Sequence, residues 1–201
     1  MFFARPAVDL APALLGLHLM RETADGRSGG MIVETEAYGG PFDRASHARA
    51  GRTRRTAPMF GPPGHAYVYL IYGLHSCLNV VSEGEGVAGA VLIRALRPLL
   101  GRELIRGRRG RPRDADARLA AGPARLCQAL AVDRTLDGHD LTCGESLWIE
   151  DPGPDERERL LAAGIDSGPR IGVAHAGEGW AERPWRFGVR GDPSLSRPFR
   201  R

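Results

Sequence analysis

Two glutamates and a tyrosine at alternating positions are the first candidates for chemistry. Glu34, Glu36 and Tyr38 belong to the apolar run 31–38, and in a β-strand residues two apart share a face. A carboxylate beside an aromatic wall suits a general base that activates water. We take Glu36 as the candidate because it lies just before the turn at residues 39–41. Glu34 is a rival by the same parity, and Glu36 could instead simply pair with an arginine.

The tyrosines of the chain gather in one region. All four lie between residues 38 and 72, interleaved with two histidines and an arginine cluster. These residues are Tyr38, Tyr67, Tyr69, Tyr72, His47, His65, Arg44, Arg49, Arg52, Arg54 and Arg55. Aromatic platforms beside cationic side chains are what stacking on a nucleobase requires. A tyrosine-rich core strand is the alternative, but the combination favours a nucleic-acid partner.

Positive charge is concentrated in the middle of the chain. The whole chain carries a net charge of +4, yet residues 44–125 hold 15 arginines against 5 acidic residues. A second cluster in this block comprises Arg102, Arg106, Arg108, Arg109, Arg111 and Arg113. Such a block is typical of a surface that binds a polyanion. The alternative is a set of solvated loops with scattered countercharges.

The composition excludes several kinds of chemistry. All 28 basic residues are arginine, so only an N-terminal amine could form a Schiff base. The histidines lack the spacings H-x-x-x-H and H-E-x-x-H, and the three cysteines form no C-x-x-C pair. We therefore expect no metal, no cofactor and a reduced, cytoplasmic protein. No segment reaches the roughly 18 apolar residues of a membrane span, so we expect no membrane partner.

The pattern of elements predicts one α+β domain over residues 1–201, with a curved, mostly antiparallel sheet, surrounding helices and a protruding β-hairpin. Strands are predicted over 31–38, 66–72, 78–82, 88–96, 146–150, 171–175 and 186–189. Helices are predicted over 10–20, 98–106 and from Pro123 to Ala131. Gly73 permits a tight turn after the second strand. Tyr72 is therefore expected at the tip of the hairpin.

Several longer runs carry a resemblance that covers nearly the whole chain in order. They are 32–38, continued by 40–41, 43, 45–47 and 51–53, and then 59–73, 77–81, 90–96, 122–130, 170–173 and 175–178. In these runs the chain resembles the alkyladenine (3-methyladenine) DNA glycosylase family. It departs from the family pattern at Ala174, where glycine is common, at Gly179, which is an additional residue, and at Gly188, where an aromatic residue is usual.

The resemblance implies a role for individual residues. Glu36 would be the general base, holding the attacking water together with Arg94 and the backbone carbonyl of Ile171. Tyr72 would wedge into the duplex in place of the flipped nucleotide. The base pocket would be formed by Tyr38, His47, Tyr69, Asn79 and Leu92. DNA-backbone contacts would come from Arg52, Arg54, Arg55, Gly122 and Pro123.

The function implied is a base-excision repair enzyme acting as a monomer on double-stranded DNA. It would flip alkylated purines such as 3-methyladenine and 7-methylguanine, with deaminated hypoxanthine as a further candidate, and hydrolyse the N-glycosidic bond. Without a lysine it would be monofunctional and leave an abasic site. The alternative is a non-catalytic protein that binds DNA lesions with the same tyrosine hairpin.

Overall fold

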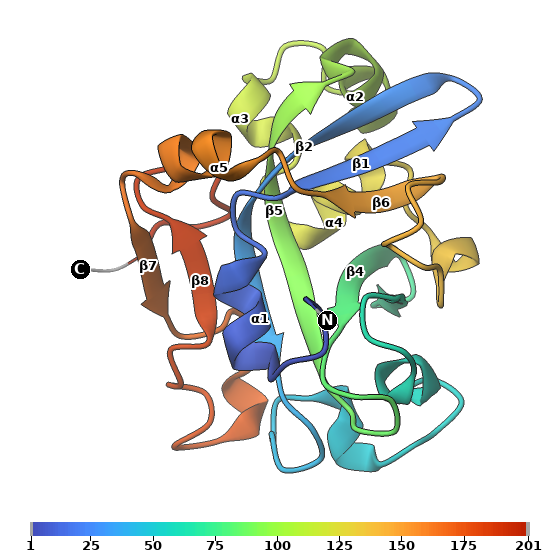
Figure 1. Cartoon of the computed structure of the whole chain (residues 1–201), viewed down its shortest axis with the longest axis vertical. Helices are drawn as coiled ribbons and strands as arrows, with labels where there is room; N and C mark the ends of the chain where they lie inside the picture. Colours follow the sequence, from blue (N-terminus) through green and yellow to red (C-terminus); the bar gives the residue numbers. More distant parts are fainter. Residues whose placement is uncertain (1, 200–201) are drawn as a thin grey trace.

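The computed structural model describes residues 2–199 and consists of one antiparallel sheet with helices around it (Figure 1). The eight strands of this part are β1 (His18–Thr23), β2 (Gly26–Tyr38), β3 (Ala66–Ile71), β4 (His75–Val81), β5 (Ala90–Leu100), β6 (Leu147–Glu150), β7 (Ile165–Gly168) and β8 (Arg186–Val189). The helices are α1 (Ala7–Ala13), α2 (Arg102–Arg109), α3 (Asp116–Leu119), α4 (Pro123–Ala129) and α5 (Pro154–Leu161). The expected α+β class with a protruding hairpin is confirmed.

Strand β2 is the centre of the sheet. The strand order is β3-β4-β5-β2-β1-β6, and β8 also pairs with β2 and carries β7. Residues 26–31 of β2 pair with β1, whereas residues 34–36 pair with β8 on the same edge. The sheet therefore divides into two arms at β2, which diverge in Figure 1.

The pairing of β2 with β5 is interrupted where the candidate residues lie. The register shifts between Ile32 and Glu34 and again between Glu34 and Thr35. At the second shift Arg94 is the residue of β5 that has no partner in the register. Bulges redirect side chains and are common beside functional sites. Here the irregularity leaves the Arg94 guanidinium between two carboxylates of β2.

The two faces of β2 have different neighbours. The Thr35 hydroxyl donates to the carbonyl of Ala11 in α1 at 2.8 Å, so Thr35 faces α1. Because side chains alternate along a strand, Glu34 and Glu36 point to the opposite face. Figure 1 shows α1 in front of β2 and β5, with α4 behind them.

The hairpin of β3 and β4 forms as expected from the local sequence. Tyr72 and Gly73 form its turn with positive φ angles of 53° and 69°. Glycine adopts such angles freely, whereas tyrosine does so at a cost. The Tyr72 side chain is 88% exposed, which is the position expected for a wedge.

Two predicted elements are wrong, and several others differ in extent. Residues 10–20 are not one helix, because α1 ends at Ala13, Gly16 turns the chain with φ 83°, and β1 begins at His18. Residues 171–175 form no strand but a turn and the start of a short 3-10 helix, with Gly172 at φ 81°. Strands β2 and β4 begin earlier than expected, at Gly26 and His75. Strand β5 extends to Leu100, so α2 starts later than expected, and α3, β7 and α5 were not predicted. Within residues 2–199, no helix is long and apolar enough to cross a membrane.

Candidate active site

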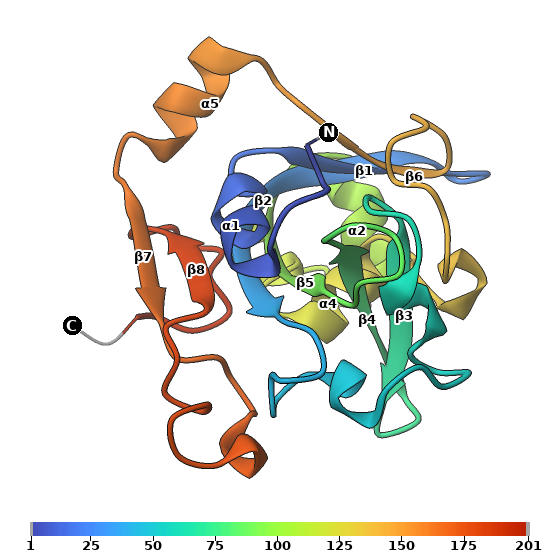
Figure 2. The ribbon, with the colours of Figure 1, turned by 60° about the horizontal axis from the view of Figure 1, so that its bottom comes forward.

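A cavity of about 480 Å³ is lined by residues of the β3–β4 hairpin and of loops 39–64 and 169–185. Figure 2 shows these segments at the same end of the molecule, at the bottom of the view. All five residues expected in a base pocket line it, together with Tyr72, Arg94 and Ile171. The five are Tyr38, His47, Tyr69, Asn79 and Leu92. The fold thus brings together residues separated by up to about 130 positions in the chain.

The sheet register explains part of this convergence. Asn79 of β4 pairs with Leu92 of β5, and Leu92 pairs with Glu36 of β2. Directly paired residues on neighbouring strands point to the same face. The row continues to Tyr67 on β3 and Arg186 on β8. Three cavity-lining residues, Tyr67, Asn79 and Leu92, therefore lie in one row with the candidate base.

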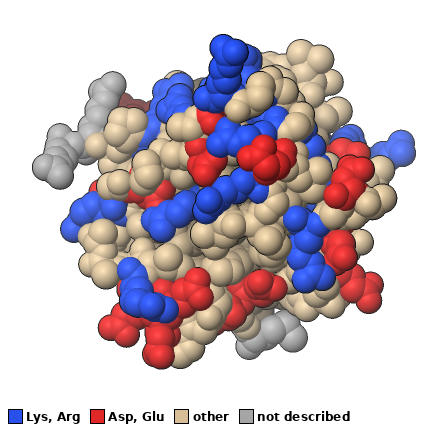
Figure 3. All heavy atoms as spheres, turned by 90° about the horizontal axis from the view of Figure 1, so that it is seen from above, with Lys and Arg blue, Asp and Glu red and all other residues tan. Residues whose placement is uncertain are grey.

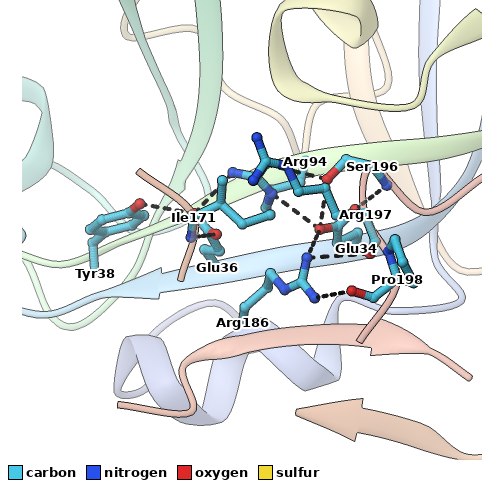
Figure 4. Close-up of polar contacts among 9 residues, drawn as sticks. All are labelled: Glu34, Glu36, Tyr38, Arg94, Ile171, Arg186, Ser196, Arg197 and Pro198. Carbon is cyan, nitrogen blue, oxygen red and sulfur yellow. Dashed lines mark hydrogen bonds and ion pairs between the residues drawn. The ribbon is translucent and has the colours of Figure 1, made fainter. Parts of the chain in front are cut away.

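Glu36 does not itself line the cavity, but Figure 4 shows it among Tyr38, Arg94 and Ile171, which do. It is completely buried and accepts three hydrogen bonds. The donors are the Tyr38 hydroxyl at 2.9 Å, Arg94 Nη1 at 3.2 Å and the Ile171 amide at 2.7 Å. All three residues also line the cavity. The carboxylate is thus held in a fixed orientation by groups that a bound base would meet.

The contact at Ile171 differs in detail from the expected role. Its amide group donates to Glu36, whereas the resemblance assigns the attacking water to its carbonyl. The role of the carbonyl stays a prediction. The expectation that Glu36 could pair with an arginine is also met, because the Glu36–Arg94 pair is at once an ion pair and part of the cavity wall.

Glu34 has different surroundings from Glu36, although both contact Arg94. Glu34 is completely buried and meets Arg94, Arg186 and Ser196. Neither Arg186 nor Ser196 lines the cavity. Glu36 is therefore the better placed of the two rival carboxylates for chemistry in the cavity.

Tyr38 is supported from behind by a buried ion pair. The guanidinium of Arg170 lies 4.8 Å from the centre of the Tyr38 ring and binds both carboxylate oxygens of Asp43, at 2.6 and 2.9 Å. Burial, and then the neighbouring Glu36 carboxylate, raise the pKa of Tyr38 well above its usual value. The hydroxyl thus remains a proton donor to Glu36.

Asp43 and Arg170 were not assigned roles from the sequence. Both occur in segments that carry the family resemblance, and Arg170 directly precedes Ile171. The adjacency to a predicted site residue is the only local signal for Arg170. The ion pair itself joins residues 127 positions apart, so the sequence pattern alone does not pair them.

His47 and Tyr69 form the other wall of the cavity. Their ring centres are 4.6 Å apart in an edge-to-face arrangement, and His47 Nδ1 lies 3.0 Å from the Tyr67 hydroxyl. Burial, with smaller effects of Arg55 and His175, lowers the pKa of His47 to about 4. The imidazole is therefore neutral near pH 7. A neutral ring can lie against a cationic base without charge repulsion.

The rim of the cavity carries the exposed Arg55 and the half-buried Pro123, two of the residues that the resemblance assigns to DNA-backbone contacts. Arg55 lines the cavity and lies 5.4 Å from the Tyr69 ring centre, and Pro123 lines it from the start of α4. Gly122, beside Pro123, has φ 126°, an angle that disfavours a side chain. Arg52 and Arg54 are exposed on the same loop but do not line the cavity.

The second arginine cluster has a different environment. Arg106 pairs with Asp116, Arg108 bonds to Ser28 and Thr23, and Arg109 bonds to Gln128. On the end of the molecule above α2 and α3, basic and acidic side chains lie side by side (Figure 3). Arg102 also pairs with Asp116, at 3.6 Å, so four of the six arginines are engaged within the protein and the charge of the cluster is partly compensated.

Comparison with known proteins agrees with the geometry. The sequence profile of the methylpurine-DNA glycosylase (MPG) family matches residues 1–193. The chain belongs to this family. A putative 3-methyladenine DNA glycosylase of Anaeromyxobacter dehalogenans is 48% identical over 98% of this chain and 84% of its own length. The mouse DNA-3-methyladenine glycosylase is 48% identical, and the human one 46%, each over 97% of this chain.

The family resemblance read from the sequence is thereby confirmed, as is the enzyme class. Members of the methylpurine-DNA glycosylase family are DNA glycosylases, hydrolases that act on the N-glycosidic bond. The chain spans 60% of the mouse protein and 66% of the human one. The matched part includes every residue of the candidate active site described above.

Proposed function

We propose that this methylpurine-DNA glycosylase excises alkylated purines from double-stranded DNA by activating water on Glu36 and leaves an abasic site. One observation carries the proposal. A completely buried carboxylate, fixed by three donors, lies behind a cavity walled by Tyr38, His47 and Tyr69. The names of the relatives support 3-methyladenine as a substrate. Hypoxanthine and 7-methylguanine are further candidates.

Recognition begins with extrusion of the damaged nucleotide. Tyr72 at the hairpin tip fills the gap left in the duplex, and the exposed arginines Arg52, Arg54 and Arg55 contact phosphates together with the turn at residues 122–123. Flipping costs a few kcal/mol and costs least for a damaged base. An alkylated purine is cationic, so each tyrosine face that it meets contributes about 0.5–2 kcal/mol of cation–π attraction.

Hydrolysis follows in the cavity. Water held by Glu36, Arg94 and the Ile171 carbonyl attacks C1′ of the sugar while Glu36 accepts its proton. The bond from C1′ to the purine nitrogen breaks, and its electron pair neutralises the departing cationic base. Glu36 then releases the proton to solvent. The chain has no lysine, so no side-chain amine attacks C1′ and the strand stays intact.

Base release from duplexes containing a single 7-methylguanine or hypoxanthine tests the proposal. We expect the wild-type protein to release the base, and Glu36→Gln to slow release by about 10²–10⁴-fold, the usual contribution of a general base. The strand should break only after alkali, and borohydride should trap no crosslink.

Three outcomes contradict this function. Equal release by the wild type and Glu36→Gln excludes Glu36 as the base. Tight binding of the lesion without release by the wild type favours the non-catalytic lesion binder. Strand cleavage without alkali, together with a borohydride-trapped crosslink, excludes the monofunctional mechanism.

A further inference from the structure

Glu34 is a buried carboxylate that the proposed chemistry does not use. It is fully shielded from solvent, and four donor atoms surround it: Arg94 Nε at 3.1 Å, Arg186 Nη1 at 3.2 Å, and the Ser196 amide and hydroxyl at 2.6 and 2.9 Å. Burying a carboxylate this completely is costly unless it is paired. We therefore expect this carboxylate to have a function that explains its burial.

The contacts of Arg94 indicate that role. Its Nε donates to Glu34, its Nη1 donates to Glu36, and its Nη2 donates to the Ser196 hydroxyl at 3.3 Å. All three nitrogens of the planar guanidinium are thus engaged by different residues (Figure 4). A planar group held at three points has one orientation. Glu34 and Ser196 fix the side of Arg94 that faces away from Glu36.

Ser196 belongs to a segment that is itself anchored at both ends. Asp192 accepts from Arg97 Nε at 2.9 Å. Arg186 donates to the carbonyls of residues 197 and 198 and lies 3.9 Å from the centre of the Phe199 ring. We call residues 192–199 the tail segment. It packs along β8, so Ser196 is held in place from both sides.

Gly188 shows how closely the tail segment fits. A Cβ atom at this position would lie 2.6 Å from the Phe199 ring and 2.8 Å from the Leu195 side chain. Phe199 of the tail segment packs against the backbone at this position, so the tail segment is a packed part of the fold.

We infer that the tail segment completes the active site, with Ser196 and Glu34 as positioning residues that hold Arg94 toward Glu36 and the attacking water. The inference rests on the proposed function. Without the Ser196 hydroxyl, Nη2 of Arg94 loses its partner, and only the bonds to Glu34 and Glu36 still fix the orientation of the guanidinium. The rate of the chemical step then falls, while the aromatic walls that bind the base are untouched.

Ser196→Ala tests this with little disturbance, because the alanine keeps the backbone amide that donates to Glu34. Ser194→Ala is the matched control: this serine is buried in the same segment, and among residues 2–199 its hydroxyl has no hydrogen-bond partner. Ser196→Thr restores a hydroxyl. The measurements are the single-turnover release rate of 7-methylguanine, the Kd for the same duplex with Glu36→Gln in the background, and urea unfolding.

We expect Ser196→Ala to lower the release rate about tenfold, as for loss of one hydrogen bond to a charged group. Ser194→Ala should stay within about twofold of the wild-type rate, and Ser196→Thr should recover most of the rate, with Kd unchanged throughout. The midpoint of urea unfolding should fall for Ser196→Ala, because this variant removes two hydrogen bonds from a buried charge cluster. Equal rates for the two alanine variants, or a loss seen only in Kd or stability, overturn the inference. A wild-type protein that releases no base overturns the proposed function instead.

Discussion

Glu34 and Glu36 are the same residue type, two positions apart on β2, both completely buried and both bound to Arg94. They differ in what else reaches them. Glu36 meets Tyr38 and the Ile171 amide on the cavity wall, whereas Glu34 meets Arg186 and the tail segment. Residue type and strand alternation thus bring a carboxylate to the site, whereas contacts with segments distant in the chain decide its role.

The charges around Arg94 compensate one another within a single cluster. Although burial alone would lower the pKa of Arg94, the Glu36 and Glu34 carboxylates raise it above its usual value. Burial lowers the pKa of Arg186, and Glu34 opposes that shift. Two arginines thus compensate two carboxylates. Removing one member should leave an unpaired buried charge, which is costly.

The largest difference between the two carboxylates is expected in stability. Glu34→Gln leaves Arg186 without a carboxylate partner and weakens the anchor of Ser196, so we expect the free energy of unfolding to fall by about 3–5 kcal/mol. Glu36→Gln leaves Arg94 paired with Glu34 and should cost only about 1–3 kcal/mol. Urea unfolding of both variants measures this. Equal losses would show that Glu34 and Glu36 contribute equally to the free energy of unfolding, against this prediction.

A smaller effect is expected when a donor to Glu36 is removed from the cavity wall. Tyr38→Phe keeps the ring but removes one of the three donors to Glu36, so the release rate should fall about tenfold while the Kd for damaged DNA stays the same. Thr35→Val is the control. It also deletes a buried hydroxyl, from the residue between the two glutamates, but this hydroxyl faces α1 and not Glu36. If Thr35→Val slows release as much as Tyr38→Phe, the donor to Glu36 is not what matters.

The smallest expected effect is a pH dependence of stability that comes from His47 in the cavity wall. The pKa of His47 in the folded protein is lowered to about 4, against about 6.5 for an unfolded histidine. Between these values the unfolded chain binds a proton that the folded protein does not, so stability falls as the pH drops from 6.5 toward 4.

His47→Gln should remove this part of the pH dependence, measured as the free energy of urea unfolding between pH 4 and 7. His75→Gln, which changes an exposed histidine of β4, should follow the wild-type curve. A constant difference between the wild type and His47→Gln at every pH would contradict the neutral state of His47 in the cavity.

Local patterns predicted those elements whose partners are close in the chain. The hairpin of β3 and β4 follows from β-forming runs on both sides of Gly73, and it places Tyr72 at its tip. The run 10–20 failed because an apolar stretch suits a buried helix or a buried strand equally. Residues 171–175 failed for a related reason, since their turn is fixed by contacts of Arg170 and Ile171 with β2 and Asp43.

The sequence by itself determined the chemical repertoire: arginine without lysine, tyrosines gathered around residues 38–72, and two carboxylates on one strand face. Because side chains alternate along a strand, neighbouring residues alone place the two carboxylates on one face. Only the tertiary structure decided which carboxylate bonds to Tyr38 and Ile171 of the cavity wall, and which arginines are bound within the protein. Those outcomes depend on contacts such as Ser196 with Glu34, 162 residues apart, and packing at that distance is set by the whole core rather than by neighbouring residues.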